Sequence, residues 1–246
     1  MAKISVQLYT LRSLMEKDFW GTLTGLSQAG FKNVEMAGLG GFTAEEVRTG
    51  LAERGMKAHS MHVGFERVRD DMDAVVAEAH TLGCEFVVVP WIDPKKFEKQ
   101  WIGVAQSLSG LADRLRGHDL WLGYHNHAFE FELQDGRPGF EIFWENACEN
   151  LIAELDLFWV KKGGHDPVDW MTRLAKRLRL AHYKDMDLNG EFTEIGSGTL
   201  DWRSIVPVSR EVKLDWAVIE NDDPKGDPLA AVIQSRNYLL GLGLKD

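Results

Sequence analysis

Carboxylate and imidazole side chains recur at the ends of short apolar segments throughout the chain of 246 residues. The densest set is Asp156 in ELDLFW, His182 in AHYKD and Glu220 in VIEND. Taken alone, each of these residues is equally well explained as a capping or ion-pairing group. Together, two carboxylates and an imidazole suit a divalent ion of intermediate hardness, with manganese, magnesium or cobalt ahead of zinc. We therefore predict a metal site that can hold two sugar oxygens and polarise a carbonyl.

Lys184 follows His182 by two residues, so on a strand both side chains point to the same side. A buried lysine beside a divalent cation is expected to have a lowered pKa, and it could then transfer protons or stabilise an enolate. The alternative is an ion pair with Asp185 or Glu220. Both interpretations place Lys184 beside the metal site.

Four further residues at segment ends are candidates for substrate contacts. Glu35 and His62 suit the hydroxyl groups of a polyol, and Trp91 and Trp159 offer flat rings with an N–H that can stack on a sugar. Packing is the more common role for any single tryptophan, because the chain has 9 of them. These residues define a predicted sugar-binding surface around the metal site.

Short apolar segments alternate with longer amphipathic ones from one end of the chain to the other, which is typical of βα units around a parallel sheet. Thr43 with Glu46 forms a capping-box pattern, and Asp227 followed by Pro228 marks another helix start. Glycine also stands before several strands, in AGF, ERGMK and LGCEF. The predicted strands are residues 4–8, 33–36, 58–63, 86–91, 120–127, 152–160, 180–184 and 217–220, and the predicted helices include 19–29, 44–54, 67–82, 97–115, 168–178 and 229–240.

This order predicts a (β/α)8 TIM barrel, an α/β fold, formed as a single domain by residues 1–246. The rival is a doubly wound open sheet, which is disfavoured because no GxGxxG follows the first strand. In a barrel the polar residues at the strand ends converge on one central cavity. The fold and the polar pattern therefore support each other.

Composition and net charge limit the kinds of binding partner that the protein is expected to have. The formal net charge of -10 would repel a phosphate backbone, so nucleic acid is not expected as a partner. No apolar run approaches the length of a membrane span or a signal peptide, and the 2 cysteines form no CxxC pair. We expect a cytoplasmic protein with no membrane partner.

Seven segments of the chain carry a resemblance to a known family, namely SVQLYTLR, GFKNVEMAG, GYHNHAFEF, ELDLFWVKKGGHDP, HYKDMD, IGSGTLDW and VIENDDP. Together they resemble the xylose isomerase-like TIM-barrel superfamily, which includes sugar isomerases and epimerases, inosose dehydratases and, more distantly, endonuclease IV. The resemblance covers nearly the whole chain and is closest to a YHNH-type branch near inosose dehydratases and keto-glycoside-cleaving members. It implies a divalent ion held by ligands on strands five to eight, the last three being Asp156, His182 and Glu220.

The first ligand departs from the pattern of the family. A carboxylate is expected on strand five, where this chain has Gly123 and His125 on one face together with His127. His125 is the favoured replacement, and Glu130 in the following loop is the alternative. If His125 binds the metal, Glu130 becomes an acid/base candidate by analogy with the epimerases, and His127 a substrate contact. Packing inside the barrel is the alternative role of the two histidines.

We therefore predict a metal-dependent isomerase or epimerase of carbohydrate metabolism that forms an enolate or enediolate of a keto-sugar or keto-polyol, with Glu220, Lys184 or Glu130 moving the proton. The alternatives are a lyase or dehydratase on the same scaffold, acting on a 3-keto-glycoside or keto-inositol, and a non-catalytic sugar-binding barrel. The glycines of IGSGTLDW indicate a loop turn rather than a phosphate site, because Arg203 is the one arginine beside them. The resemblance also implies a homo-oligomer, since dimers and tetramers are common in the family.

Overall fold

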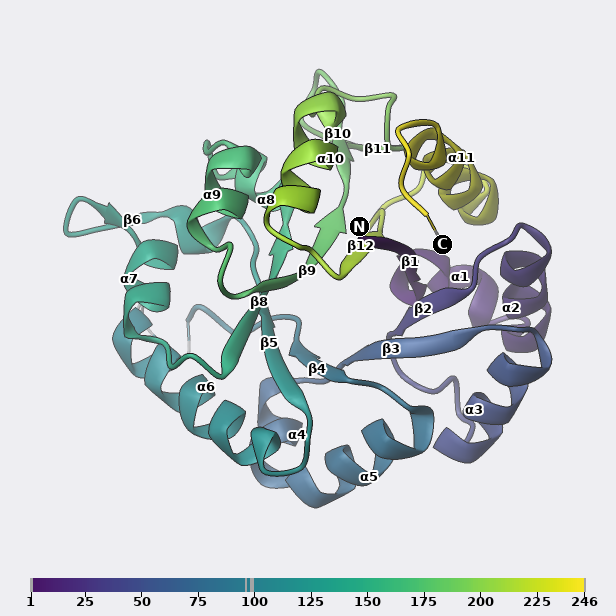
Figure 1. The fold of residues 1–246 in the computed structure, drawn as a ribbon, viewed down its shortest axis with the longest axis horizontal. Helices are drawn as coiled ribbons and strands as arrows, with labels where there is room; N and C mark the ends of the chain where they lie inside the picture. Colours follow the sequence, from purple (N-terminus) through teal and green to yellow (C-terminus); the bar gives the residue numbers. More distant parts are fainter. Residues whose placement is uncertain (1, 96, 98–99, 246) are drawn as a thin grey trace.

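The computed structural model describes residues 2–95, 97 and 100–245, which form a closed barrel of parallel strands (Figure 1). Among these residues the barrel has eight strands in the order β1-β12-β9-β8-β5-β4-β3-β2. Because β1 pairs with both β2 and β12, the sheet closes, and the open-sheet alternative is wrong. The strands are β1 (Lys3–Gln7), β2 (Asn33–Met36), β3 (Lys57–His62), β4 (Phe86–Val89), β5 (Trp121–His125), β8 (Leu151–Asp156), β9 (Leu178–Tyr183) and β12 (Trp216–Ile219).

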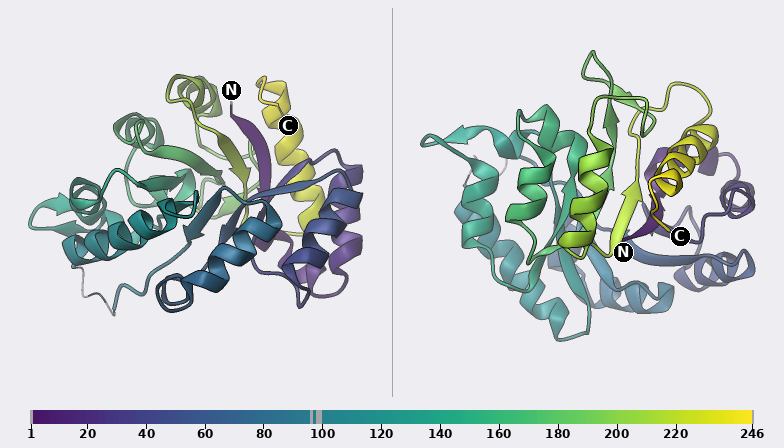
Figure 2. Two further views of the ribbon diagram at one scale, coloured as in Figure 1. Left: turned by 60° about the horizontal axis from the view of Figure 1, so that its bottom comes forward. Right: turned by 45° about the horizontal axis from the view of Figure 1, so that its top comes forward.

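Helices surround the barrel in every view (Figure 2). The predicted single-domain (β/α)8 barrel is thus confirmed. The helical elements are η1 (Leu8–Leu11), α1 (Arg12–Met15), α2 (Phe19–Gln28), α3 (Ala44–Glu53), α4 (Phe65–Asp70), α5 (Met72–Leu82), α6 (Trp101–Arg116), η2 (Phe129–Phe131), α7 (Gly139–Asn146), α8 (Leu157–Lys162), α9 (Pro167–Arg173), α10 (Trp202–Glu211) and α11 (Pro228–Gly241). None of the described helices is both long enough and apolar enough to cross a lipid bilayer.

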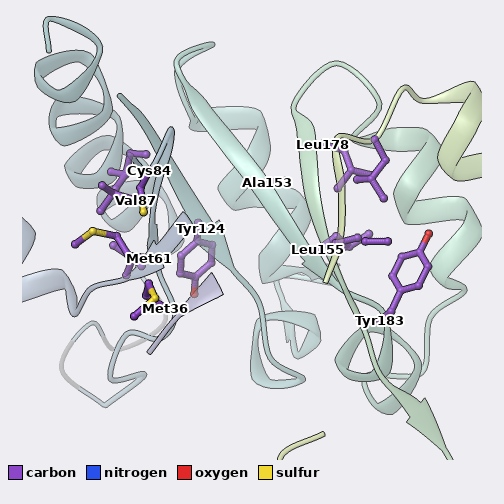
Figure 3. Close-up of a cluster of buried hydrophobic side chains, with 14 of the residues drawn as sticks. Met36, Met61, Cys84, Val87, Tyr124, Ala153, Leu155, Leu178 and Tyr183 are labelled. Carbon is purple, nitrogen blue, oxygen red and sulfur yellow. The ribbon is translucent and has the colours of Figure 1, made fainter. Parts of the chain in front are cut away.

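Alternate residues of β4 pack into two different hydrophobic clusters. On β4, Val87 and Val89 join the large cluster shared with the helices, whereas Phe86 and Val88 join a small cluster with Ile152 and Leu180 inside the barrel. Figure 3 shows members of the large cluster, among them Tyr124, Leu155 and Tyr183. The apolar small cluster fills the lower barrel, which leaves the carboxyl ends of the strands for polar side chains.

Local signals in the sequence explain several element ends. Thr43 and Glu46 form the predicted capping box, and the Asp227 side chain accepts a hydrogen bond from the backbone N–H of Leu229. Gly83 ends α5 with a φ of 78°, a left-handed conformation that glycine adopts without strain. Helix α3 and helix α11 therefore begin where the sequence indicates, and α5 ends where it indicates.

Three predicted strands end at least two residues earlier than expected, and the one predicted over 120–127 ends at His125. The strand predicted over 152–160 stops at Asp156, and Trp159 lies in α8 instead. The Asp156 side chain accepts a hydrogen bond of 2.9 Å from the backbone N–H of Trp159, so this residue both ends the strand and caps the helix. Strand β4 ends at Val89, which places Trp91 in the following loop.

Three predicted helices differ from the observed ones. The helix predicted over 67–82 is two helices, α4 and α5, that meet at Asp71. The helix predicted from residue 97 begins at Trp101, while residues 98–99 lie outside the described part of the chain. Helix α9 ends at Arg173, and Leu178, expected in the helix, begins β9.

Two short hairpins extend the loops above the barrel. The QDGRPG segment lies in a hairpin of β6 (Leu133–Gln134) and β7 (Arg137–Pro138). A second hairpin of β10 (Asp185–Met186) and β11 (Phe192–Thr193) follows β9. Both follow strands that carry candidate site residues.

Candidate metal centre

A cleft of about 520 Å³ opens at the carboxyl ends of the barrel strands. Six residues predicted as site residues line it, namely His62, Trp91, His125, His127, Lys184 and Glu220. Tyr9 and Asp222, which the sequence did not single out as site residues, line it as well. The cleft therefore gathers residues from loops and strands on most sides of the barrel.

The four residues favoured as metal ligands lie together at the base of this cleft. Donor atoms of His125, Asp156, His182 and Glu220, called here the outer group, all lie within 4.8 Å of one another. His125 Nε2 lies 3.1 Å from Asp156 Oδ2, and His182 Nδ1 lies 2.6 Å from Glu220 Oε2. All four side chains are almost completely buried. Parallel pairing of Asp156 with His182 places their strands in the register that this group requires.

The ring of His125 is oriented as a metal ligand needs. Its Nδ1 lies 3.2 Å from the carbonyl oxygen of Pro90, and because a carbonyl can only accept, Nδ1 carries the proton. Nε2 is then the nitrogen that faces Asp156. Metal-binding histidines commonly donate their second nitrogen to a carbonyl or carboxylate in this way. Of the two alternatives for the first ligand, the structure brings His125 into the outer group and leaves Glu130 outside it.

Asn126, the asparagine of YHNH, holds Asp156 in place. Its side-chain oxygen accepts a hydrogen bond of 2.9 Å from the backbone N–H of Asp156. The sequence prediction missed this role, although the position between two inward-facing histidines was a signal. The YHNH motif therefore supplies both a member of the outer group and support for its neighbour.

Lys184 places a buried ammonium against the same carboxylates. Its Nζ lies 2.9 Å from Asp156 Oδ2, 2.6 Å from Glu220 Oε2 and 2.9 Å from Asp222 Oδ2. Burial lowers the pKa of a lysine, but these three carboxylates outweigh it and hold the pKa of Lys184 well above its ordinary value. Of the two expectations for Lys184, the ion pair with Glu220 is present, whereas a lowered pKa beside a bound cation stays a prediction.

The carboxylates of the outer group are ionised. Burial raises the pKa of Asp156, but Lys184 and His125 outweigh it and lower the pKa to about 2. Burial likewise raises the pKa of Glu220, and the charges of Lys184 and His182 bring it well below its ordinary value. Two ionised carboxylates and two imidazoles form a donor set that fits a divalent ion of intermediate hardness.

A second cluster lies deeper in the barrel. Donor atoms of Glu35, His62, Glu154 and His182, called here the inner group, also lie within 4.8 Å of one another. Glu35 is completely buried and does not line the cleft, whereas His62 does. The sequence prediction missed Glu154, although it precedes Asp156 by two residues and strand alternation places both on one face.

Neighbouring side chains hold Glu35 as an anion. Gln7 Nε2 donates to Glu35 Oε1 over 2.8 Å, and the Ser60 hydroxyl donates to Oε2. Burial raises the pKa of Glu35, but the charges of and hydrogen bonds from His62 and His182 lower it well below its ordinary value. In turn, the carboxylates outweigh the burial of His62 and raise the pKa of its ring to about 10.

Glu130 and Trp159 lie beside the cleft rather than in its lining. Glu130 is completely buried, where it accepts hydrogen bonds from the Tyr124 hydroxyl over 2.7 Å and from the backbone N–H of His127 over 2.9 Å. Burial raises the pKa of Glu130 to about 8, against the opposing effect of the Tyr124 hydrogen bond. The ring centroids of Trp159 and His127 lie 5.2 Å apart, so Trp159 packs against a residue that lines the cleft.

The IGSGTLDW segment folds around Asp185 instead of presenting free amides. Asp185 accepts hydrogen bonds from the backbone N–H groups of Gly196, Gly198 and Leu200 and from the indole of Trp202, over 2.7–3.2 Å. A phosphate would have to compete for amides that are already bonded. This supports the interpretation of the glycines as a loop turn.

The fold and the outer group together define a (β/α)8 barrel with a candidate metal centre at the carboxyl ends of its strands. The chain belongs to the xylose isomerase-like TIM barrel family, whose model matches residues 24–240.

Comparison with known proteins places inosose dehydratases among the relatives. The enzyme of Geobacillus kaustophilus is 23% identical over 257 residues, covering 85% of this chain and 80% of the relative. The enzyme of Lacticaseibacillus casei is 23% identical over 167 residues, covering 59% of this chain. This match spans 56% of the Lacticaseibacillus protein, so a large part of that relative lies outside it.

Solved structures share the barrel at low sequence identity. A sugar phosphate isomerase/epimerase from Parabacteroides distasonis has a TM-score of 0.84 at 21% identity, covering 98% of both chains. The IolI protein with a bound zinc atom has a TM-score of 0.72 at 14% identity, covering 98% of this chain and 97% of the other. At these identities the likeness shows the common fold.

Proposed function

We propose that the protein is a divalent-metal-dependent isomerase or epimerase that acts on a keto-sugar or keto-polyol through an enolate or enediolate. The observation that carries this proposal is the outer group with Lys184, at the base of an open cleft. Ionised carboxylates, imidazoles and an ammonium converge there on a space that a small polar substrate can enter. The family and the names of its members are consistent with this chemistry.

His125, Asp156, His182 and Glu220 are the proposed ligands of the ion. Manganese, magnesium and cobalt suit this set best, and zinc, present in the IolI structure, suits it as well. When bound, such an ion holds vicinal sugar oxygens and offsets the negative charge that develops on the carbonyl oxygen. The backbone support of Asp156 by Asn126 and the Pro90 contact of His125 orient the ligands.

Lys184 and Glu220 are the proposed catalytic pair. Both line the cleft, with Lys184 Nζ 2.6 Å from Glu220 Oε2. Glu220 is ionised and removes the proton from the carbon next to the carbonyl. Lys184 is held as an ammonium and donates a hydrogen bond to the oxygen on which charge develops. Glu130, also predicted as an acid/base, contributes indirectly in this scheme by holding the backbone of His127.

Substrate contacts come from the walls of the cleft. Trp91 is 49% exposed and offers a free ring face on which a sugar can stack. His62 and His127 line the cleft and suit sugar hydroxyl groups. Trp159, predicted as a second stacking surface, supports His127 from behind, and Glu35, predicted to contact substrate, supports His62 and His182 from below.

One observation favours a lyase or dehydratase as the second candidate. Asp222 lines the cleft 2.9 Å from Lys184 Nζ, so a second acidic group accompanies the ammonium at the cleft. Burial and Glu220 raise the pKa of Asp222, which suits an acid that protonates a leaving hydroxyl or glycosidic oxygen. The inosose dehydratase relatives are consistent with this route.

The first test is metal content. Elemental analysis of the purified protein is expected to find manganese, magnesium, cobalt or zinc, and the metal is expected to be lost in Asp156→Ala and Glu220→Ala. Glu141→Ala, which changes a carboxylate on the helical surface, is the matched control and should retain it. Protein that neither contains nor takes up a divalent ion would overturn the proposed mechanism and favour the sugar-binding barrel.

The second test distinguishes the reactions. Keto-sugars and 3-keto-glycosides are incubated with the loaded enzyme in deuterium oxide and followed by proton NMR. Exchange at the carbon next to the carbonyl with retention of the carbon skeleton and all hydroxyl groups supports isomerisation or epimerisation. Loss of water or of an aglycone supports the lyase, and absence of exchange and elimination with bound metal contradicts both.

A further inference from the structure

We propose that the inner group, Glu35, His62, Glu154 and His182, binds a second divalent cation below the first. The ion is of the class that nitrogen and carboxylate ligands select, such as zinc or cobalt. The site draws one residue each from β2, β3, β8 and β9. The barrel would then hold two ions, one in the outer group near the cleft and one in the inner group below it.

The inner donor atoms alternate around a closed ring. His62 Nε2 lies 3.1 Å from Glu35 Oε1 and 2.8 Å from Glu154 Oε2. His182 Nε2 lies 2.7 Å from Glu35 Oε1 and 3.2 Å from Glu154 Oε2. The two imidazole rings are parallel, with an interplanar angle of 8°. Two nitrogens and two oxygens thus lie within 4.8 Å of one another.

Hydrogen bonds alone do not account well for this ring. Each Nε2 carries at most one proton, so the four short contacts can share no more than two hydrogens. A central cation satisfies all four atoms at once. Zinc binds nitrogen and carboxylate oxygen at about 2.0–2.2 Å, so ligand atoms at the corners of a tetrahedron lie about 3.4 Å apart. The observed contacts of 2.7–3.2 Å need only a small expansion to reach this geometry.

A second observation points to the same ligand. Glu154 is completely buried, and its other oxygen, Oε1, has no hydrogen-bond partner in the described part of the chain. A buried carboxylate oxygen without a partner is costly, whereas a bound cation compensates its charge. Gln7 and Ser60 hold Glu35 from behind, as outer hydrogen bonds commonly hold metal ligands.

His182 connects the two groups through different nitrogens. Nδ1 faces Glu220 in the outer group, and Nε2 faces Glu35 and Glu154 in the inner group. With both ions bound, Nδ1 would hold the outer ion and Nε2 the inner one, and the ring would release its remaining proton to solvent. The inference rests on the proposed function only through this shared residue, because the other three inner residues take no part in the outer group.

The inner group is reachable from the cleft. His62 lines the cleft, and its side chain is 12% exposed, whereas the other inner residues are completely buried. An ion can therefore enter beside the His62 ring. Exchange of the inner ion is expected to be slower than exchange of the outer one.

The test counts ions in protein stripped with chelator and dialysed against zinc or, separately, cobalt. Elemental analysis is expected to give two ions per chain in the wild type and one in His62→Gln, Glu154→Gln and Asp156→Asn. His59→Gln is the matched control, because His59 is a buried histidine on the same strand β3 whose Nε2 contacts Ser5 instead. This control should retain both ions. Circular dichroism and urea unfolding verify that each variant is folded.

Two further readouts do not depend on the variants. Titration of the wild type with cobalt should give two steps in the visible absorption, the second with the intensity of a tetrahedral nitrogen and oxygen site. Binding heats measured in buffers of different ionisation enthalpy should show proton release for each ion. Both measurements use the intact chain.

The number of ions bound by the wild type and the variants distinguishes the alternatives. One ion in the wild type that His62→Gln retains would show that the inner group is a hydrogen-bonded cluster, which overturns this inference and leaves the proposed function standing. One ion that both His62→Gln and Asp156→Asn lose would indicate a single shared site, and the inference would again fail. No ion in the wild type would overturn the proposed function together with the inference.

Discussion

Glu154 and Asp156 point into the barrel from the same strand, yet they serve different groups. Glu154 Oε2 lies 2.8 Å from Nε2 of His62, and Asp156 Oδ2 lies 3.1 Å from Nε2 of His125. Side chains two residues apart on a strand point to the same side, so β8 contributes Glu154 to the inner group and Asp156 to the outer group. His182 on the neighbouring strand contacts both carboxylates and therefore connects the inner group with the outer group.

Replacement of Lys184 with methionine should destabilise the metal-free protein by about 3 kcal/mol, because it leaves buried carboxylates without their cation. A divalent ion bound to the outer group replaces that charge, so the loss should shrink when the metal is present. Urea unfolding with chelator and with saturating manganese measures both values. Lys162→Met, which removes an exposed lysine on α8, is the control and should change stability by less than about 1 kcal/mol. Equal losses with and without metal would contradict the placement of the ion.

Replacement of Asp185 with asparagine should lower the free energy of unfolding by about 2–4 kcal/mol. The carboxylate accepts hydrogen bonds from Gly196, Gly198 and Leu200, and an amide nitrogen cannot accept them. Urea unfolding measures the change. Asp187→Asn, in the turn of the same hairpin, changes a partly exposed carboxylate and should have a smaller effect. A loss no larger than that of Asp187→Asn would show that Asp185 does not hold this loop.

Glu130 should make the protein less stable as the pH rises. Its pKa is about 8 in the folded protein, mainly because of burial, against an ordinary value of 4.5. Between these values the unfolded chain releases a proton that the folded chain retains, so the contribution to stability is full below about pH 4.5 and falls as the pH approaches about 8.

Glu130→Gln removes this titration while it keeps the shape and the hydrogen-bonding groups of a protonated carboxyl. Its stability relative to the wild type should therefore increase with pH, by an amount on the order of a few kcal/mol between about pH 5 and about pH 8. Urea unfolding at a series of pH values measures the difference. A pH-independent difference would mean that Glu130 is ionised in the folded protein.

Trp91→Ala should weaken substrate binding without a loss of stability. The side chain is 49% exposed at the cleft, so its removal should change the free energy of unfolding by no more than about 0.5 kcal/mol. Loss of a stacking surface should raise KM about tenfold with a smaller change in kcat. Steady-state kinetics and thermal unfolding test the two parts. Ile102→Ala, another exposed apolar residue, is the control and should leave KM unchanged.

The fold could be predicted because a (β/α)8 barrel repeats one local pattern. Short apolar segments alternate with longer helical ones along the chain, and the capping box at Thr43 and the glycine at Gly83 act through local backbone geometry. The end of β8 could not be read in this way, because LFWV is as apolar as a strand. The side-chain contact from Asp156 to the backbone of Trp159 begins a helix there.

The site could be predicted only in part. The outer group follows from residues at strand ends, whereas depth in the barrel depends on how neighbouring strands are staggered. Glu35 therefore looked like a cleft residue, although pairing of β2 with β1 and β3 places it beside Gln7 and Ser60 below the cleft. Glu154 lies two residues before the end of β8, and its position along this one strand does not indicate that its carboxylate reaches His62 and His182.

The contrast between the exposed Trp91 and the buried carboxylates has an evolutionary consequence. Trp91 and Tyr9 lie at the rim on segments outside the barrel strands, and each is nearly half exposed. Under the proposed function, mutations there would alter which sugar is accepted while the fold tolerates them. Glu154 and Asp156 share a strand and the neighbour His182, so a mutation at either one disturbs buried charged groups. Under the proposed function, a change of substrate would therefore require mutations only at the rim, and the buried groups at the base could stay as they are.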